Sequence, residues 1–166
     1  VKDRVTASEN WHTGEIRICI EAALPNSYLL RPGNLRAITR QRALSQFGKL
    51  RVWDTEHNNG VLVYLLLAER SIELVADRGL NAFVPPQGWH VMVERLGEAL
   101  REGRFEDGLA TAIDEVSAVL EAHFPLAPDQ VLDGLAFAAP DAVVTDLWSA
   151  GRHQVKDGRH IHREQI

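Results

Sequence analysis

Two short polar segments carry most of the side chains in this sequence that could do chemistry. One follows Trp53 and the other follows Ala76. Together they contain carboxylates, amides, a histidine and an arginine, namely Asp54, His57, Asn58, Asn59, Asp77 and Arg78. Carboxylate and amide oxygens are the hard ligands that calcium takes, whereas magnesium demands a stricter octahedron. The sequence therefore predicts a calcium site formed by Asp54, Asn58, Asn59 and Asp77.

The same residues also have a purely structural interpretation. Asn-Asn-Gly at 58–60 and Asp-Arg-Gly at 77–79 form turns, in which the side chains bond to their own backbone and glycine accepts a positive φ. A carboxylate at a strand end can also cap the next turn or pair with Arg78. A histidine in a polar loop, such as His57, is usually solvated, and acid–base catalysis would require a neighbouring partner. Both interpretations stay open from the sequence.

Apolar patterns predict the elements that hold these segments. Isoleucines alternate with polar residues over 15–21, which indicates a strand, and the continuous branched run over 61–68 indicates a central strand buried on both faces. A third strand is expected over 72–76. Apolar residues at helical spacing predict three helices, over 35–50, 86–102 and 105–123.

The order of these elements predicts an α/β fold, with a small mixed β-sheet and helices packed on it. Only three residues separate the second and third strands, which permits an antiparallel hairpin but no parallel crossover. The first strand is expected to run parallel to the second through a right-handed helical crossover. The hairpin would then bring Asp54 and Asp77 to one end of the sheet. Glu21, which closes the first strand, would lie at the opposite end and is left out of the site.

Composition and charge exclude several classes of function. The chain has 166 residues and a formal net charge of -5, so it offers no basic face for a nucleic acid. No apolar run reaches the roughly 20 residues of a membrane helix, and no signal peptide is recognisable, which favours a cytoplasmic location. The single cysteine, Cys19, is expected to pack as a small hydrophobe. Nucleophile-elbow, phosphate-loop and zinc-spaced motifs are missing.

Four segments in order, 14–25, 50–62, 75–79 and 103–108, resemble the TPM domain family, and the resemblance extends over about residues 9–124. It implies an α/β sandwich with a loop-end site that binds calcium in some relatives and is assigned weak acid-phosphatase activity in plant members. The site carries over to Asp54, Asn58, Asn59 and Asp77, with Arg78 as an adjacent anion contact. Longer relatives often have Asp at position 58, and one carboxylate fewer predicts weaker binding of calcium here.

The pattern changes after residue 127, which predicts a TPM-like domain over 1–127 and a β-rich tail over 128–166. Residues 131–166 resemble the C-terminal strands of amidohydrolases, particularly formiminoglutamate deiminases, where this region carries no metal ligand. The catalytic barrel of those enzymes has no counterpart in the sequence, so deaminase chemistry is not expected.

Two functions of different classes follow from these observations. The first is a binding or assembly domain that docks a protein partner and holds calcium at the sheet end. The second is a metal-assisted phosphatase for a small phosphate ester, with Arg78 and His57 as substrate-binding residues. Phosphoryl-transfer sites usually gather several acids around the ion. This sheet end supplies only Asp54 and Asp77 with amides, so binding is favoured.

Overall fold

The computed structural model describes residues 2–127, 147–149, 152–156 and 159–160. Contacts divide the chain into two units, Val1–Leu126 and Ala127–Ile166, and each unit is described by itself. The first unit has the element order α1 (Lys2–Ser8), β1 (Ile16–Glu21), α2 (Asn26–Leu29), α3 (Leu35–Lys49), β2 (Val61–Leu66), β3 (Ser71–Ala76), the short 3-10 helix η1 (Arg78–Ala82), α4 (Pro86–Arg101) and α5 (Phe105–His123).

The sheet of the first unit is mixed and has β2 at its centre. Its strand order is β1-β2-β3. β1 runs parallel to β2 with Ile16 opposite Val61, and β2 runs antiparallel to β3 with Val61 opposite Ala76. The predicted topology is therefore confirmed, including the parallel crossover through α3 and the hairpin. Glu21 lies opposite Leu66, at the end of the sheet away from Val61.

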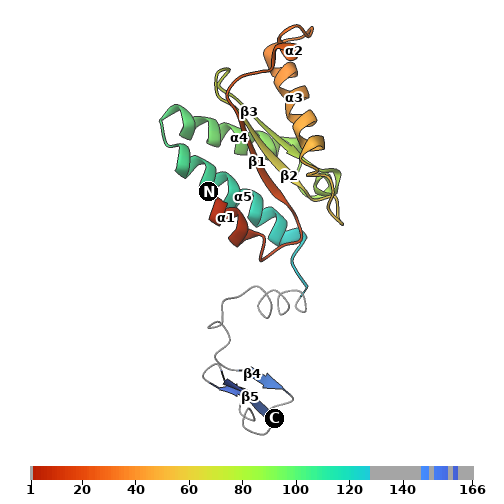
Figure 1. The fold of residues 1–166 in the computed structure, drawn as a ribbon, viewed down its shortest axis with the longest axis vertical. Coiled ribbons are helices and arrows are strands. Elements are labelled where there is room, and N and C mark those ends of the chain that lie inside the picture. Colours follow the sequence, from red (N-terminus) through yellow and green to blue (C-terminus); the bar gives the residue numbers. More distant parts are fainter. Residues whose placement is uncertain (1, 128–146, 150–151, 157–158, 161–166) are drawn as a thin grey trace. The chain divides into compact units, whose positions relative to one another are not determined.

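Helices cover both faces of this sheet, as Figure 1 shows, with α3 on one side and α4 and α5 on the other. Alternate residues of β2 point to the two layers. Leu62, Tyr64 and Leu66 pack in one cluster with Ile38 and Ala43 of α3. Val61, Val63 and Leu65 pack on the opposite side in two clusters with residues of α4 and α5, namely Leu96, Leu109, Ala112, Val116 and Leu120. All six residues of β2 are buried, as its continuous apolar pattern predicted.

Local signals explain where the helices begin and end. Asn34 caps α3, since its side-chain oxygen accepts a hydrogen bond from the Ala37 amide at 2.9 Å. Pro86 occupies the first position of α4, and Gly103 follows that helix with a φ of 77°. The elements α1, α2 and η1 were not predicted. Each spans seven residues or fewer, which is too short for an apolar period to be recognised.

The second unit contains β4 (Leu147–Ser149), β5 (Arg152–Lys156) and β6 (Arg159–His160), which form an antiparallel sheet in that order. The rest of the predicted β-rich tail, at 128–146, 150–151, 157–158 and 161–166, lies outside the described residues. The resemblance of this tail to amidohydrolases stays a prediction.

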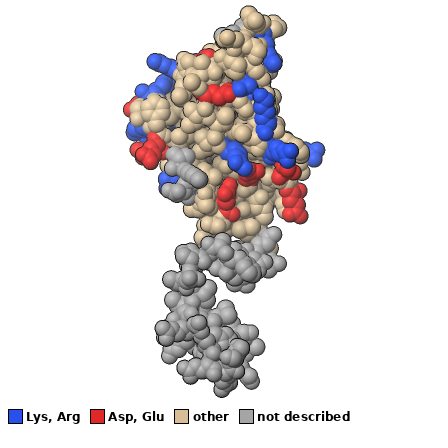
Figure 2. Space-filling model, viewed as in Figure 1, with Lys and Arg blue, Asp and Glu red and all other residues tan. Residues whose placement is uncertain are grey.

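Two general properties bear on function. No helix within the described ranges combines the length and the apolar composition that crossing a membrane requires. Figure 2 shows one face of the molecule, on which acidic and basic residues are interspersed. That face presents no broad basic surface of the kind that binds a nucleic-acid backbone.

Candidate functional site

The β2–β3 hairpin brings the two polar segments together at one end of the sheet. The Asp77 amide donates to the Gly60 carbonyl at 2.9 Å, and the Gly79 amide donates to the Asn58 carbonyl at 2.9 Å. Arg78 adds a side-chain contact, because its Nε donates to Asn58 Oδ1 at 3.2 Å. The loop before β2 and the turn after β3 therefore form one connected surface, as the topology predicted.

The two glycines of this surface are needed for a different reason from the one expected. Neither Gly60 nor Gly79 has a positive φ, and that conformation is adopted instead by Asn58, at 52°. A Cβ on Gly60 would lie 1.8 Å from the Val52 carbonyl oxygen, and one on Gly79 would lie 2.2 Å from the His57 carbonyl oxygen. Close approach of backbone therefore excludes a side chain at both positions, while asparagine tolerates the left-handed conformation of the turn.

Two of the predicted ligands keep a buried oxygen without a partner. Asn59 is fully buried; its Nδ2 donates to Thr13 Oγ1 at 3.1 Å, and its backbone amide donates to Thr55 Oγ1 at 2.9 Å. Asp77 Oδ1 accepts from the Arg78 amide at 2.7 Å. No described residue bonds to Asn59 Oδ1 or to Asp77 Oδ2, although both atoms are buried. Unpaired buried oxygens are uncommon in folded proteins and call for a bound group or water.

Other members of the predicted set are less closely connected. The exposed Asp54 belongs to the same loop, and its backbone amide donates to the Arg51 carbonyl at 2.9 Å. His57 is exposed, and the centroid of its ring lies 6.1 Å from that of Phe124. The Phe124 ring in turn packs edge-on against Phe83. The described part of the chain holds no group of three or more His, Cys, Asp or Glu residues that could bind a metal. A cation at this end would therefore need amide or backbone oxygens among its ligands.

The opposite end of the sheet carries a hydrogen-bonded network around Glu21. This carboxylate accepts from both Nε and Nη2 of Arg42, from Gln46 Nε2 at 2.6 Å and from the Tyr64 hydroxyl at 2.5 Å. Hydrogen bonds from Arg42 are the main reason that the pKa of Glu21 falls to about 2. Burial, reinforced by the nearby carboxylate, raises the pKa of Tyr64 well above its usual range. Every acceptor position of Glu21 is occupied, so this network is a structural tie between β1, β2 and α3.

A second buried network, not recognised in the sequence, joins α1 to α5. Ser8 Oγ lies 2.8 Å from His12 Nε2 and 2.6 Å from Ser117 Oγ, while His12 Nδ1 lies 3.0 Å from the Gly14 carbonyl oxygen. Burial lowers the pKa of His12. The Ser8–His12 spacing of four residues was a sequence signal, but nothing in the sequence placed Ser117 beside it.

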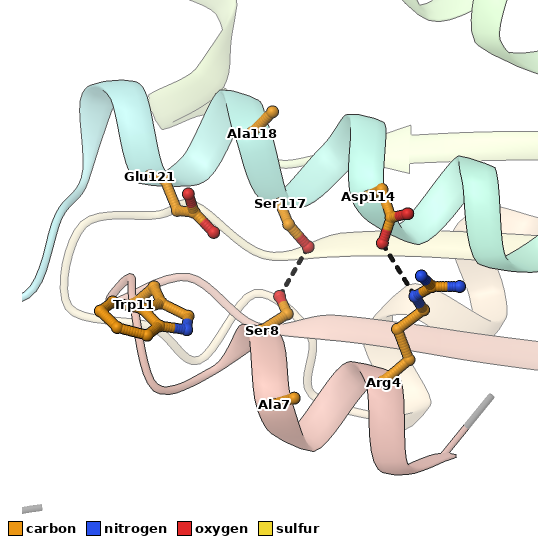
Figure 3. A pocket seen from close by; sticks show the side chains of 8 residues that line it. All are labelled: Arg4, Ala7, Ser8, Trp11, Asp114, Ser117, Ala118 and Glu121. Carbon is orange, nitrogen blue, oxygen red and sulfur yellow. Dashed lines mark hydrogen bonds and ion pairs between the residues drawn. The ribbon is translucent and has the colours of Figure 1, made fainter.

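A shallow pocket of about 300 Å³ lies over this second network. Figure 3 shows that Ser8 and Ser117 meet between the two helices and that Arg4 of α1 reaches Asp114 of α5. A serine beside an imidazole is the pair used in nucleophilic catalysis, but here the hydroxyls and the ring are engaged with one another. The pocket shares no lining residue with the Asn58–Asp77 surface. We assign this network a structural role in holding α1 on α5.

Comparisons with known proteins agree with this architecture. Solved structures similar to this chain include the NMR structure of the BA42 protein from the psychrophilic bacterium Bizionia argentinensis and the solution NMR structure of the N-terminal domain of a protein from P. gingivalis. The first has a TM-score of 0.63 and 24% identity, covering 77% of this chain and 81% of that one. The second has a TM-score of 0.51 and 21% identity, covering 74% of this chain and 72% of that one.

At these identities the two structures support the fold alone. No curated protein matched the chain significantly. The family model described as the TPM domain matches residues 1–119, which include every helix and strand of the first unit up to most of α5. The chain therefore belongs to the TPM domain family.

Proposed function

We propose that this TPM domain is a binding or assembly domain that holds a calcium ion at the open end of the β2–β3 hairpin, away from the turn between the two strands. Asp77 and Asn59 supply the central ligands, and Asn58 and Asp54 of the same loop complete the set. The observation that supports this proposal is the pair of buried, unpartnered oxygens, Asn59 Oδ1 and Asp77 Oδ2. Both belong to residues selected as ligands on their chemistry.

The local backbone explains why these two oxygens lack a donor. The amides of Asn59, Asp77 and Gly79 are already bonded to Thr55 Oγ1, the Gly60 carbonyl and the Asn58 carbonyl. A hard cation satisfies carboxylate and amide oxygens without a hydrogen-bond donor. Since only two of the four proposed ligands are carboxylates, the expected affinity is low, with a dissociation constant on the order of 10⁻⁴ to 10⁻³ M.

Calorimetric titration with calcium tests the site. Asp77→Asn removes the charge but keeps an oxygen that can accept from the Arg78 amide, so the fold should survive while binding is lost. Asp107→Asn is the matched control, because Asp107 is an exposed carboxylate in the first turn of α5. The control variant should bind calcium as the unmodified chain does.

A gain of affinity gives an independent test of the same site. Asn58→Asp adds a carboxylate at a left-handed position that Asp tolerates, and its oxygen can still accept from Arg78 Nε. We expect calcium to bind at least several-fold more tightly to this variant. Absence of binding heat at millimolar calcium in both the unmodified chain and the Asn58→Asp variant would overturn the calcium proposal.

A second candidate, a weak metal-assisted acid phosphatase, has one supporting observation. The exposed Arg78 is anchored through Nε to Asn58, next to Asp77, where its guanidinium could hold a phosphate ester beside a bound cation. Hydrolysis of p-nitrophenyl phosphate with calcium and with magnesium tests this function. Turnover that disappears in both Arg78→Gln and Asp77→Asn, and persists in Asp107→Asn, would favour the phosphatase. Turnover at the buffer rate would exclude it for that substrate.

A further inference from the structure

The pocket between α1 and α5 is formed by side chains that share one face of each helix. Its centre is lined by four small residues at helical spacing, Ala7 and Ser8 on one side and Ser117 and Ala118 on the other. Their side chains leave a hollow of about 300 Å³, which lies at the low end of the range for ligand sites. The pocket is therefore suited to a small chemical group rather than to a large ligand.

Three pairs of side chains face one another across this pocket. At one end, Arg4 Nε lies 3.0 Å from Asp114 Oδ1, and in the middle the two serine hydroxyls lie 2.6 Å apart. One further turn along both segments brings Trp11 and Glu121 to the other end, as Figure 3 shows. The first pair joins a cation to an anion, whereas the third places an anion opposite an aromatic ring.

The Glu121 carboxylate lacks a counterion among the described residues. It is exposed, and no described side chain forms an ion pair or a hydrogen bond with it. Its charge raises the pKa of His12, but burial lowers that pKa more strongly, so the His12 ring is neutral at neutral pH and cannot serve as the counterion. Arg4 is already paired with Asp114. The end of the pocket at Glu121 therefore carries a negative charge that the described chain does not compensate.

Trp11 presents an aromatic surface at the same end of the pocket. Its side chain is 62% exposed, which is high for a large aromatic residue. The backbone around it is well tied, because its amide donates to the Ser8 carbonyl at 3.0 Å and its carbonyl accepts from the Leu126 amide at 3.2 Å. The face of an indole ring is negative and attracts a cation. Trp11 and Glu121 therefore favour the same ligand, a positively charged group between them.

We propose that the pocket between α1 and α5 binds a guanidinium group, which stacks on the Trp11 ring and pairs with the Glu121 carboxylate. The bound group supplies the third pair with the cation that Arg4 supplies to the first. The small residues at the centre leave room for the group beside the two serines, and the network of Ser8 with His12 keeps its role of holding the two segments together.

Guanidinium fits this pocket better than the other common organic cations. Its plane stacks on an indole ring, while its N–H donors lie in that plane and reach acceptors at the edge. The pocket supplies acceptors of this kind, namely the Glu121 carboxylate and the lone pairs of the serine hydroxyls. An alkylammonium is compact and strongly hydrated, so it gains less from the ring. A quaternary ammonium has no donor for the carboxylate.

Nuclear magnetic resonance of the isotope-labelled full chain tests the site. The indole N–H resonance of Trp11 is assigned with the Trp11→Phe variant and followed during titration with acetyl-arginine amide. We expect a saturable shift at millimolar concentration, because both contacts are exposed. Acetyl-citrulline amide has a similar shape without the charge and should cause no shift, and acetyl-lysine amide should bind more weakly. The resonance of Trp53, which is also exposed, should not move.

Two variants test the charge and the cavity separately. Glu121→Gln keeps the size of the side chain, removes its charge and should weaken binding about threefold, as expected for an exposed ion pair. Glu106→Gln is the matched control, because it makes the same change at an exposed position in the first turn of α5. Ala118→Leu fills the pocket without altering a charge and should abolish the shift.

Two further probes distinguish the sources of the group. Ethylguanidinium represents a free guanidino compound, and the blocked pentapeptide Gly-Gly-Arg-Gly-Gly represents an arginine of a partner protein. Tighter binding of the peptide would identify a protein as the source, and equal binding would identify a free compound. Either result supports the guanidinium site.

Three outcomes would overturn the proposal. The first is the absence of a saturable shift of the Trp11 resonance at tens of millimolar acetyl-arginine amide. The second is equal binding of the citrulline or the lysine probe, because neither offers a planar cation. The third is an equal effect of Glu121→Gln and Glu106→Gln, which a general attraction of cations to this acidic chain would produce.

Discussion

Replacing Glu21 by Gln tests whether the hydrogen-bonded network around this residue stabilises the fold. Glu21 is the last residue of β1 and accepts hydrogen bonds from Arg42 of α3 and Tyr64 of β2. Arg42 is 9% exposed and Tyr64 is fully buried. Glutamine keeps the size of the side chain but leaves the buried guanidinium without an anion, and its own amide group turns a donor toward Arg42.

The pKa of Glu21 gives the magnitude. Hydrogen bonds from Arg42 lower this pKa from 4.5 to about 2. Since each pKa unit corresponds to about 1.36 kcal/mol, the ionised form would be favoured in the folded state by about 3 kcal/mol. Solvent at the open side of the carboxylate screens part of this interaction, because 20% of the side chain is exposed. We expect Glu21→Gln to lower the free energy of unfolding by about 2 kcal/mol at neutral pH.

The pH dependence separates this cause from a simple packing defect. Because the folded pKa lies below the unfolded value, the stabilisation is complete above about pH 4.5 and is lost as the pH falls toward 2. Urea unfolding followed by far-UV circular dichroism should therefore show a difference between the two chains that falls by about half between about pH 6 and about pH 3. Glu102→Gln, an exposed carboxylate paired with Arg104, is the control and should change stability far less. A difference that is the same at both pH values would refute the reasoning.

Three further predictions concern the Asn58–Asp77 surface and the α1–α5 network. Gly60→Ala should lower the free energy of unfolding, measured in urea, by more than about 3 kcal/mol, because the added Cβ would meet the Val52 carbonyl oxygen. Gly48→Ala is the control: this position of α3 has open space around it, so the change should be neutral or slightly stabilising. Ser8→Ala should lower the free energy of unfolding by about 1 to 3 kcal/mol, and Ser117→Ala by less, because only the first leaves buried His12 Nε2 without a partner. Since burial lowers the pKa of His12, its contribution is present above about pH 6.5 and is lost as the pH falls, so His12→Gln should flatten the stability between about pH 7 and about pH 5.

Patterns with a long or uninterrupted apolar period predicted the fold well. The continuous run that became β2 is buried at every position, and the limits of α4 and α5 follow Pro86, Gly103 and Pro125 to within a residue or two. The three-residue link before β3 left only an antiparallel partner for β2. These signals are local, so a single sequence is enough to recognise them.

The candidate site could be predicted only in part. Topology placed Asn58, Asp77 and Arg78 at one end of the sheet, and their hydrogen bonds confirm that they meet. The conformational roles were wrong, because the left-handed residue is Asn58 and the glycines serve close backbone contacts. Such contacts join residues distant in sequence, for example Gly60 and Val52 across the loop, and no local pattern records them.

Buried oxygens without a donor among the described residues occur at Asn59 and Asp77 and, at the other end of the sheet, at Glu69 in the β2–β3 turn, but only Asn59 and Asp77 belong to the predicted ligand set. At Glu21, donors from Arg42, Gln46 and Tyr64 fill all the acceptor positions of one carboxylate. At the opposite end of the sheet the amides of Asn59, Asp77 and Gly79 already have acceptors, and Asn59 and Asp77 each retain a buried oxygen without a donor among the described residues. An excess of acceptors can be balanced by water or by a cation, but only a cation makes the balance depend on the charge of Asp77. A response to calcium that vanishes in Asp77→Asn and persists in Glu21→Gln would therefore locate the ligand beside Asp77.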